Sequence, residues 1–296
     1  MSAMDHFFGY PTQGLPDCLA PPFPRMIQWG GATTYKMQSA MTYIFILQQP
    51  TFWVCNLLHF YYTLNTVTAS FSHTGGVLIH DINYYKKENR LPRYYNVNWG
   101  FEDQKLYQFA KEDITELAAD ESPFFYGMLT VDTHPNGYIC DLCDKDYAPG
   151  EEYQAVFECG DRQVDEFVKW AQEQDWYEDT LIVLMGDHTM PQECAAKIYP
   201  DGYDDSRRKW IDVFVNADQD PDSGLKKDRK FCSVDMFPTI LEAMGVSIDG
   251  HGLGFGRSLF SAEPTLMEQM PVSEMEDEMN TICTQYIYWE TGEYAE

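Results

Sequence analysis

FFYGMLTVDTHP (residues 124–135) and TLIVLMGDH (residues 180–188) are the two stretches that decide the fold. Each begins with a nearly continuous apolar run, which is typical of a strand covered on both faces. Each ends in a short polar segment that contains a histidine. Helical patterns lie between and around these runs, so strands alternate with helices along the chain. The sequence therefore predicts an α/β fold with a mostly parallel sheet sandwiched by helices.

The elements around these strands follow from apolar spacing and from capping residues. Asp103 is expected to cap a helix that places Leu106, Ala110 and Ile114 on one face. The other expected elements are a helix over 161–174, a third strand over 210–216, and a helix that opens at Ser233 or Asp235 and stops at Gly245.

The composition divides the 296 residues into unlike parts. Residues 1–80 carry four charged side chains only, at Asp5, Asp17, Arg25 and Lys36. We therefore expect a charge-poor, unassigned segment over 1–78, a catalytic-type domain over 79–265, and an acidic tail over 266–296. The segment 1–78 has three interpretations: a membrane-associated lead-in, a separate small module, or sequence outside the ancestral domain. We favour the third, in which the α/β domain lacks its N-terminal part. Polar residues interrupt the apolar stretch 41–64, which does not favour a membrane-spanning helix.

The net charge is −27, which argues against a nucleic-acid partner, because phosphate backbones attract Lys and Arg. A surface this acidic is by itself most often a means of staying soluble.

Two polar segments follow the two buried strands, where open α/β sheets place their ligands. Asp187 and His188 offer an oxygen and a nitrogen ligand to one divalent cation, and Gly186 allows a sharp turn there. A turn with a capped helix is the alternative interpretation of this pair. A single loop histidine such as His134 is usually a surface residue, but here it would lie beside the other polar loop at one sheet edge.

In this order, residues 79–103, 124–143, 180–188 and 231–260 resemble the lipoteichoic acid synthase and phosphoglycerol transferase branch of the sulfatase (alkaline-phosphatase-like) superfamily. The resemblance covers about residues 79–262. It implies an α/β/α domain on the extracellular face of the bacterial cell membrane, in the cell envelope, with membrane-anchored full-length relatives. The implied reaction moves phosphoglycerol-type groups from a lipid or polymer onto cell-envelope polymers or glycans.

The resemblance also implies roles for individual residues. Asp187 and His188 match the family's metal-binding pair, and His134 matches the histidine that contacts the substrate phosphate. The implied cofactor is a divalent metal ion, Mn, with Mg and Zn as alternatives. A threonine nucleophile and an acidic ligand on the first strand should precede residue 79, where Thr33 and Thr34 are the only faint matches for the threonine.

Because no convincing nucleophile is found, we predict that this chain turns over phosphodiesters poorly or not at all. Two other functions stay open. One is a sulfatase or phosphodiesterase with the same metal site, and the other is a non-catalytic acidic extracellular domain.

Cys140, Cys143 and Cys159 cluster in the sequence, and their state has three interpretations. A Cys143–Cys159 disulfide is the simplest for an extracellular enzyme. Free thiols are the second. The third is a zinc site that also uses Cys140 and His134, although one CxxC without a partner pair is weak support.

Overall fold

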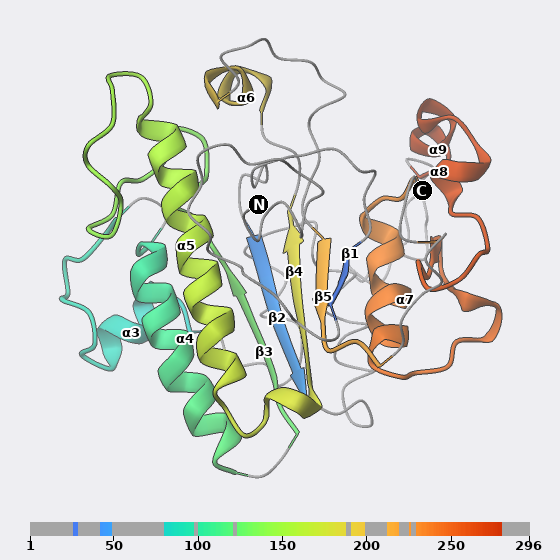
Figure 1. Cartoon of the computed structure of the whole chain (residues 1–296), viewed down its shortest axis with the longest axis horizontal. Helices are drawn as coiled ribbons and strands as arrows, with labels where there is room; N and C mark the ends of the chain where they lie inside the picture. Colours follow the sequence, from blue (N-terminus) through green and yellow to red (C-terminus); the bar gives the residue numbers. More distant parts are fainter. Residues whose placement is uncertain are drawn as a thin grey trace, which may run out of the picture.

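The structure, a computed structural model, describes residues 26–28, 42–48, 80–97, 100–120, 123–187, 191–198, 212–218, 225 and 229–279. The described strands form a five-stranded sheet in the order β1-β5-β4-β2-β3, and a separate β6-β7 pair (Figure 1). The strands are β1 Met26–Gln28, β2 Thr42–Gln48, β3 Phe125–Leu129, β4 Thr180–Gly186, β5 Asp212–Val215, β6 Gly252–Leu253 and β7 Gly256–Arg257. The α-helices are α3 Ile82–Lys87, α4 Asp103–Ala118, α5 Glu152–Gln172, α6 Gln192–Ile198, α7 Ser233–Ala243, α8 Leu266–Gln269 and α9 Val272–Met279.

Neighbouring strands of the five-stranded sheet pair antiparallel, so the expected mostly parallel sheet is wrong for these pairings. The reason is that β2, from the charge-poor segment, inserts between β3 and β4 in the opposite direction, and β5 also runs opposite to β4. Both β3 and β4 are antiparallel to β2 and are therefore parallel to each other. Their connection through α5 is the long crossover that parallel strands need. The prediction that the two apolar runs are near-neighbours in one sheet is confirmed.

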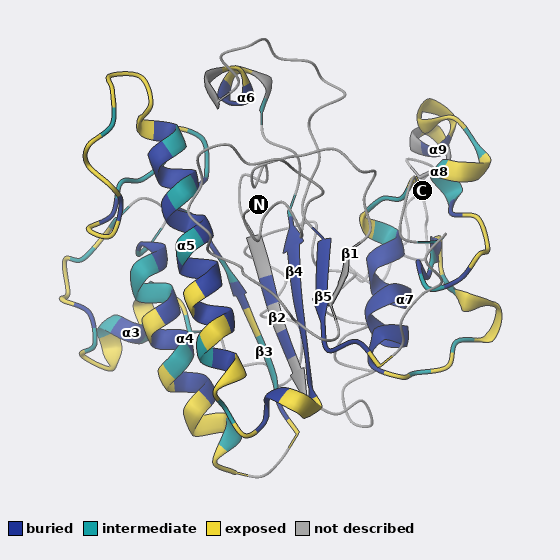
Figure 2. Ribbon diagram, in the orientation of Figure 1, coloured by how far each residue is buried: buried dark blue, intermediate teal, exposed yellow. Residues whose placement is uncertain are grey.

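Helices cover both faces of the sheet, as expected from the buried apolar runs (Figure 1). Every residue of β4 is buried (Figure 2). Its side chains alternate between two cores, because successive residues of a strand point to opposite faces. Ile182 and Leu184 belong to the core under α4 and α5, which includes Phe167. Val183 and Met185 belong to the core under α7. The molecule is thus a three-layer α/β/α sandwich.

Two helices differ from their expected starts. Helix α4 begins at Asp103 itself, and Glu102 occupies the cap position. The Asp103 side chain instead bonds to the segment after β3, so it does not cap its own helix. Helix α5 begins at Glu152, earlier than the expected residue 161, because the apolar face continues back to Tyr153. Helix α7 starts at Ser233 as expected, with Asp235 accepting the Cys232 backbone N–H.

The region after residue 265 contains described helical structure. α8 and α9 lie within the segment that was expected to be an acidic tail. Arg229 fastens this region by donating hydrogen bonds to Glu268 and to the Ser261 carbonyl oxygen, at 2.7 Å each. Within the described part of the chain, no helix has the length and apolarity needed to cross a membrane. The beginning of the apolar stretch 41–64 forms β2, where Ile44 and Ile46 are buried.

Candidate metal and phosphate site

The segment after β3, which carries His134, is held by hydrogen bonds from both neighbouring helices. The buried Asp103 carboxylate of α4 accepts the backbone N–H groups of Val131, at 2.7 Å, and Asp132, at 3.2 Å. From α5, the Tyr153 hydroxyl donates to the Thr133 carbonyl oxygen at 2.9 Å. These bonds satisfy backbone groups that a loop inside the fold would otherwise leave unpaired. His134 itself is half-buried.

A turn at His134 completes this segment. The His134 backbone N–H bonds to the Val131 carbonyl oxygen at 3.1 Å, and the Gly137 N–H bonds to the His134 carbonyl oxygen at 2.8 Å. Gly137 has a φ of +64°, and a Cβ there would lie 2.8 Å from the Tyr153 ring. A glycine is therefore required for the turn to close against α5.

The ends of β3 and β4 lie at the same level of the sheet. Leu129 of β3 and Met185 of β4 are both Cα partners of Tyr43 in the intervening strand β2. Because neighbouring strands lie about 4.8 Å apart, the two chain exits are about 10 Å apart. Asp187 follows at the end of β4 and is half-buried. His188 lies outside the described residues, as do Thr33 and Thr34.

Two further carboxylates at this edge were not assigned a role from the sequence. Asp132 follows β3, and Asp212 opens β5 as the Cα partner of Met185. Both are almost fully buried, and neither carboxylate has a hydrogen-bond partner in the described part of the chain. The sequence feature that marks Asp212 is a single charged residue at the start of an apolar strand. No histidine follows it, so it does not resemble the Asp187–His188 pair.

Burial sets the electrostatics of these groups. Burial, followed by the neighbouring Asp103 carboxylate, raises the pKa of Asp132 to about 9. Burial likewise raises the pKa of Asp103 to about 7. The hydrogen bonds from two backbone N–H groups lower this pKa, but their effect is smaller than that of burial. Burial alone raises the pKa of Asp212 well above its usual range. Buried carboxyl groups without partners are costly, and a cation is the kind of group that compensates them. The edge therefore suits a divalent metal ion.

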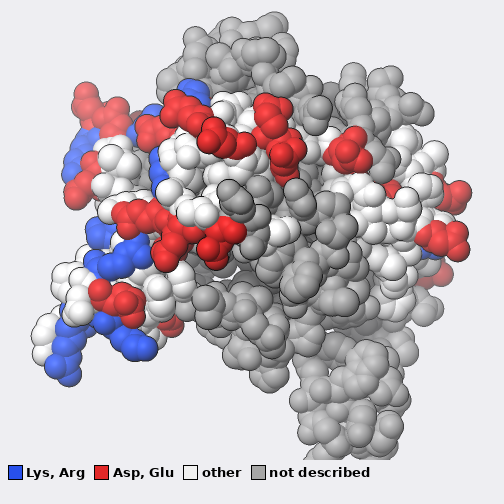
Figure 3. Space-filling view, turned by 90° about the horizontal axis from the view of Figure 1, so that it is seen from below, with Lys and Arg blue, Asp and Glu red and all other residues white. Residues whose placement is uncertain are grey.

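Acidic and basic side chains are distributed unevenly over the surface of the described residues (Figure 3). On the face shown in Figure 3, acidic side chains are spread widely among the described residues. The Lys and Arg side chains on that face gather on the left, the side of α3, which has Lys86 and Lys87 in its last turn.

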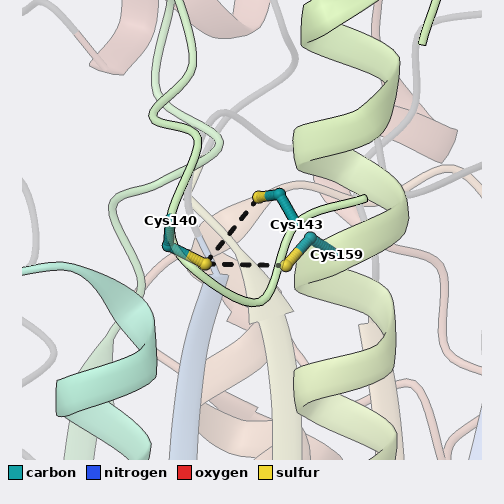
Figure 4. Close-up of side chains that lie close together, drawn as sticks. All are labelled: Cys140, Cys143 and Cys159. Carbon is teal, nitrogen blue, oxygen red and sulfur yellow. Dashed lines mark hydrogen bonds between the residues drawn. The ribbon is translucent and has the colours of Figure 1, made fainter. Parts of the chain in front are cut away.

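The cysteine cluster lies between the segment after β3 and α5 (Figure 4). Cys140, Cys143 and Cys159 are buried and free. The expected Cys143–Cys159 disulfide is therefore wrong. Cys140 instead lies between the other two, with Sγ–Sγ distances of 3.7 Å to each. Hydrogen bonding to Cys143 and Cys159 lowers the pKa of Cys140 to about 2. His134 does not join this group, because no described histidine belongs to it.

Comparison with known proteins identifies the family of this chain. The sulfatase family model matches residues 48–246. The chain belongs to the sulfatase family. The family match begins at residue 48, so it includes part of the charge-poor segment and the last residue of β2. The suspected superfamily is therefore confirmed.

This sulfatase-family chain is similar to proteins named phosphoglycerol transferase I. Those of Escherichia coli, Citrobacter koseri and Shigella boydii serotype 18 are each 29% identical to it over 178 residues. Each match covers 58% of this chain and 22% of the relative, so the chain spans about a fifth of these relatives' length. These similarities support the suspected phosphoglycerol transferase branch. No solved structure matches the chain significantly.

Proposed function

We propose that this chain carries the metal-binding and phosphate-contacting part of a phosphoglycerol transferase that acts at the bacterial cell envelope. Asp187 and His188 would hold a divalent cation, with Mn preferred over Mg and Zn. His134 would contact the substrate phosphate. The substrate class is a phosphoglycerol-bearing lipid or polymer, which agrees with the names of the relatives.

The observation that carries this proposal is that β3 and β4 end at the same level of the sheet. Leu129 and Met185 share Tyr43 as partner, so the segment with His134 and the residue Asp187 leave the sheet at the same level, on either side of β2. A phosphate group that touches His134 can then reach a cation held at Asp187. When bound, the cation supplies charge neutralisation and lowers the pKa of an attacking hydroxyl.

The chain's own residues position the reacting groups. Asp103 and Tyr153 fix the segment of His134 from two helices, which limits how far the imidazole can move. The imidazole is a hydrogen-bond donor to a phosphate oxygen, and such a bond strengthens as charge develops. Asp212 is the Cα partner of Met185, two residues before Asp187, and its buried carboxyl would favour cation binding by giving up its proton to the cation's charge.

The first residue of β2 also pairs at this edge. Thr42 is the Cα partner of Gly186, immediately before Asp187. This neighbourhood makes Thr42 a position to test beside Thr33 and Thr34. The expectation of weak turnover by this chain stays a prediction, because catalysis needs the complete site.

Metal binding is the first test. We expect isothermal titration with MnCl₂ to show binding to the purified chain, and at least tenfold weaker binding to Asp187→Ala, since a direct ligand is lost. Asp175→Ala is the matched control, because Asp175 is exposed near the end of α5. Equal binding by wild type and Asp187→Ala would overturn the site.

Turnover is the second test. Diacylglycerol release from phosphatidylglycerol vesicles and hydrolysis of a chromogenic aryl sulfate are compared with and without Mn. We expect any turnover to be of the phosphodiester, to need Mn and to fall in Asp187→Ala. Faster turnover of the sulfate ester would identify a sulfatase instead. Mn binding without any turnover would point to a non-catalytic descendant.

A further inference from the structure

Three buried sulfur atoms converge from two elements of the fold. Cys140 and Cys143 come from the segment that follows β3, and Cys159 comes from the middle of α5 (Figure 4). Their exposed fractions are 3%, 6% and 1%. All three sulfur atoms lie within 4.8 Å of one another. Among the described residues, no histidine, aspartate or glutamate belongs to this group, so its ligand set differs from the Asp187–His188 pair.

The distances between the sulfur atoms match metal coordination. Zinc binds thiolate sulfur at about 2.3 Å in tetrahedral geometry, which separates two ligand sulfurs by about 3.8 Å. The Cys140–Cys143 and Cys140–Cys159 separations are both 3.7 Å. A disulfide would need a separation of about 2.05 Å. It would also use two of the three thiols and leave one buried without a bond partner.

The surroundings resemble those of a metal–thiolate group. The spacing of Cys140 and Cys143 is the CxxC spacing common in zinc sites. The Gln163 side-chain amide donates to Cys159 Sγ at 3.5 Å, as outer-shell groups do to bound thiolates. The Arg162 guanidinium donates to the Leu142 carbonyl oxygen at 3.2 Å and so holds the CxxC turn against α5.

We propose that Cys140, Cys143 and Cys159 bind one Zn²⁺ in a structural site that fastens the segment after β3 to α5. Three Zn–S bonds form, and the thiol protons are released to solvent. A water molecule would take the fourth position. Thiolates select zinc, whereas an aspartate–histidine pair also accepts manganese or magnesium, so the two sites differ in chemistry.

The consequence concerns the segment that carries His134. That segment is held at one end by β3 and, in this proposal, at the other by the metal on α5. The zinc site does not rest on the proposed transferase activity. Loss of zinc should loosen the segment, while loss of Asp187 should leave the zinc in place.

The test measures zinc in the full chain purified without chelator. We expect about one zinc per chain by elemental analysis, as for a structural site. Cobalt substitution should give the intense near-ultraviolet absorption of sulfur-to-cobalt charge transfer. Cys159→Ser should lose most of the zinc and of this absorption. Gln163→Ala should weaken zinc binding roughly tenfold, as outer-shell changes do.

Cys194→Ser is the matched control, because Cys194 is buried and free but lies outside the cluster. It should keep both the zinc and the cobalt absorption. Since a cluster variant can fail to fold, thiol alkylation of the wild-type chain is the second measurement. The three cysteines should be protected in the zinc-bound chain and become reactive after chelation. Zinc-free protein, or a disulfide between any two of the three, would overturn the proposal.

Discussion

Leu129 and Met185 flank the same residue, Tyr43, from the two sides of β2. This relationship places the ends of β3 and β4 at one level of the sheet, although the strands are far apart in the sequence. His134 follows one end and Asp187 follows the other. Strand spacing puts the two exits about 10 Å apart, and in the proposed function one phosphate group and one cation would span them.

The Asp103 carboxylate should be the main support of the segment after β3. Replacing it by alanine leaves the buried N–H groups of Val131 and Asp132 without acceptors, at roughly 1–3 kcal/mol each. We therefore expect Asp103→Ala to lower the free energy of unfolding by about 2 kcal/mol or more, measured by urea unfolding near pH 6. Asp103→Asn retains one acceptor and should lose less. An alanine variant as stable as wild type would show that these bonds do not support the fold.

The Asp103–Asp132 pair predicts a dependence of stability on pH. The pKa of Asp132 in the folded chain, about 9, lies above its unfolded value, so the folded chain binds more protons in the window between them. Stability should therefore fall as pH rises from about 4 to about 9. Asp132→Asn removes this titration.

Urea unfolding at pH 5 and pH 9 checks this. The asparagine variant should be more stable than wild type at pH 9 by more than about 1.4 kcal/mol, the free energy of one pKa unit. At pH 5 the gap should be much smaller. The exposed Asp175→Asn should follow the wild-type pH curve. If the difference in unfolding free energy between Asp132→Asn and wild type were the same at both pH values, Asp132 would not be a buried, protonated carboxyl.

The core under α5 should be sensitive to truncation. Phe167 is fully buried and contacts the rings of Tyr107 and Trp170. Phe167→Ala should cost about 3–5 kcal/mol, because it removes buried apolar area and leaves a cavity. Phe255 is 62% exposed, so Phe255→Ala should change stability by less than about 0.5 kcal/mol. Thermal unfolding measures the stability of both variants. A similar loss of stability in Phe167→Ala and Phe255→Ala would contradict the packing described for Phe167.

Arg229 should hold the region after residue 260 to the rest of the domain. Its guanidinium bonds to both carboxylate oxygens of Glu268 and to the carbonyl oxygens of Ser261 and Glu263. We expect Arg229→Met to make the amides of α8 exchange faster with deuterium, while those of α5 stay protected. Lysine lacks the planar fork and should restore protection only in part. Unchanged exchange in the methionine variant would contradict this role.

The sequence predicted the α/β layers from the continuous apolar runs at 124–131 and 180–185. Burial on both faces explains this run in β4, whose residues are all buried, but not in β3, which ends the strand order and has Met128 as its one buried residue. It could not predict strand direction, since β2 comes from a segment whose pattern is weak and whose partners are distant. The start of α5 was missed because the apolar face begins with Tyr153, before the clearer repeat at Val164 and Phe167.

The candidate site was predicted to the extent that its residues sit next to apolar strands. Asp187 and His134 were found from that position and from the family resemblance. Asp103 was assigned to helix capping because its bonds to Val131 and Asp132 depend on tertiary contact. Asp212 was missed because its place beside Met185 depends on the pairing of β5 with β4. The cysteines were read as a disulfide because spacing alone cannot tell a sulfur separation of 3.7 Å from a bond.

The position of bound manganese tests the central claim most directly. Crystals of the full chain grown with MnCl₂ should give an anomalous peak within about 2.0–2.3 Å of an Asp187 carboxylate oxygen and a His188 ring nitrogen. Asp187→Ala crystals should lack this peak, while any zinc peak at the three cysteines should remain. Manganese bound away from both Asp187 and His188 would contradict the account.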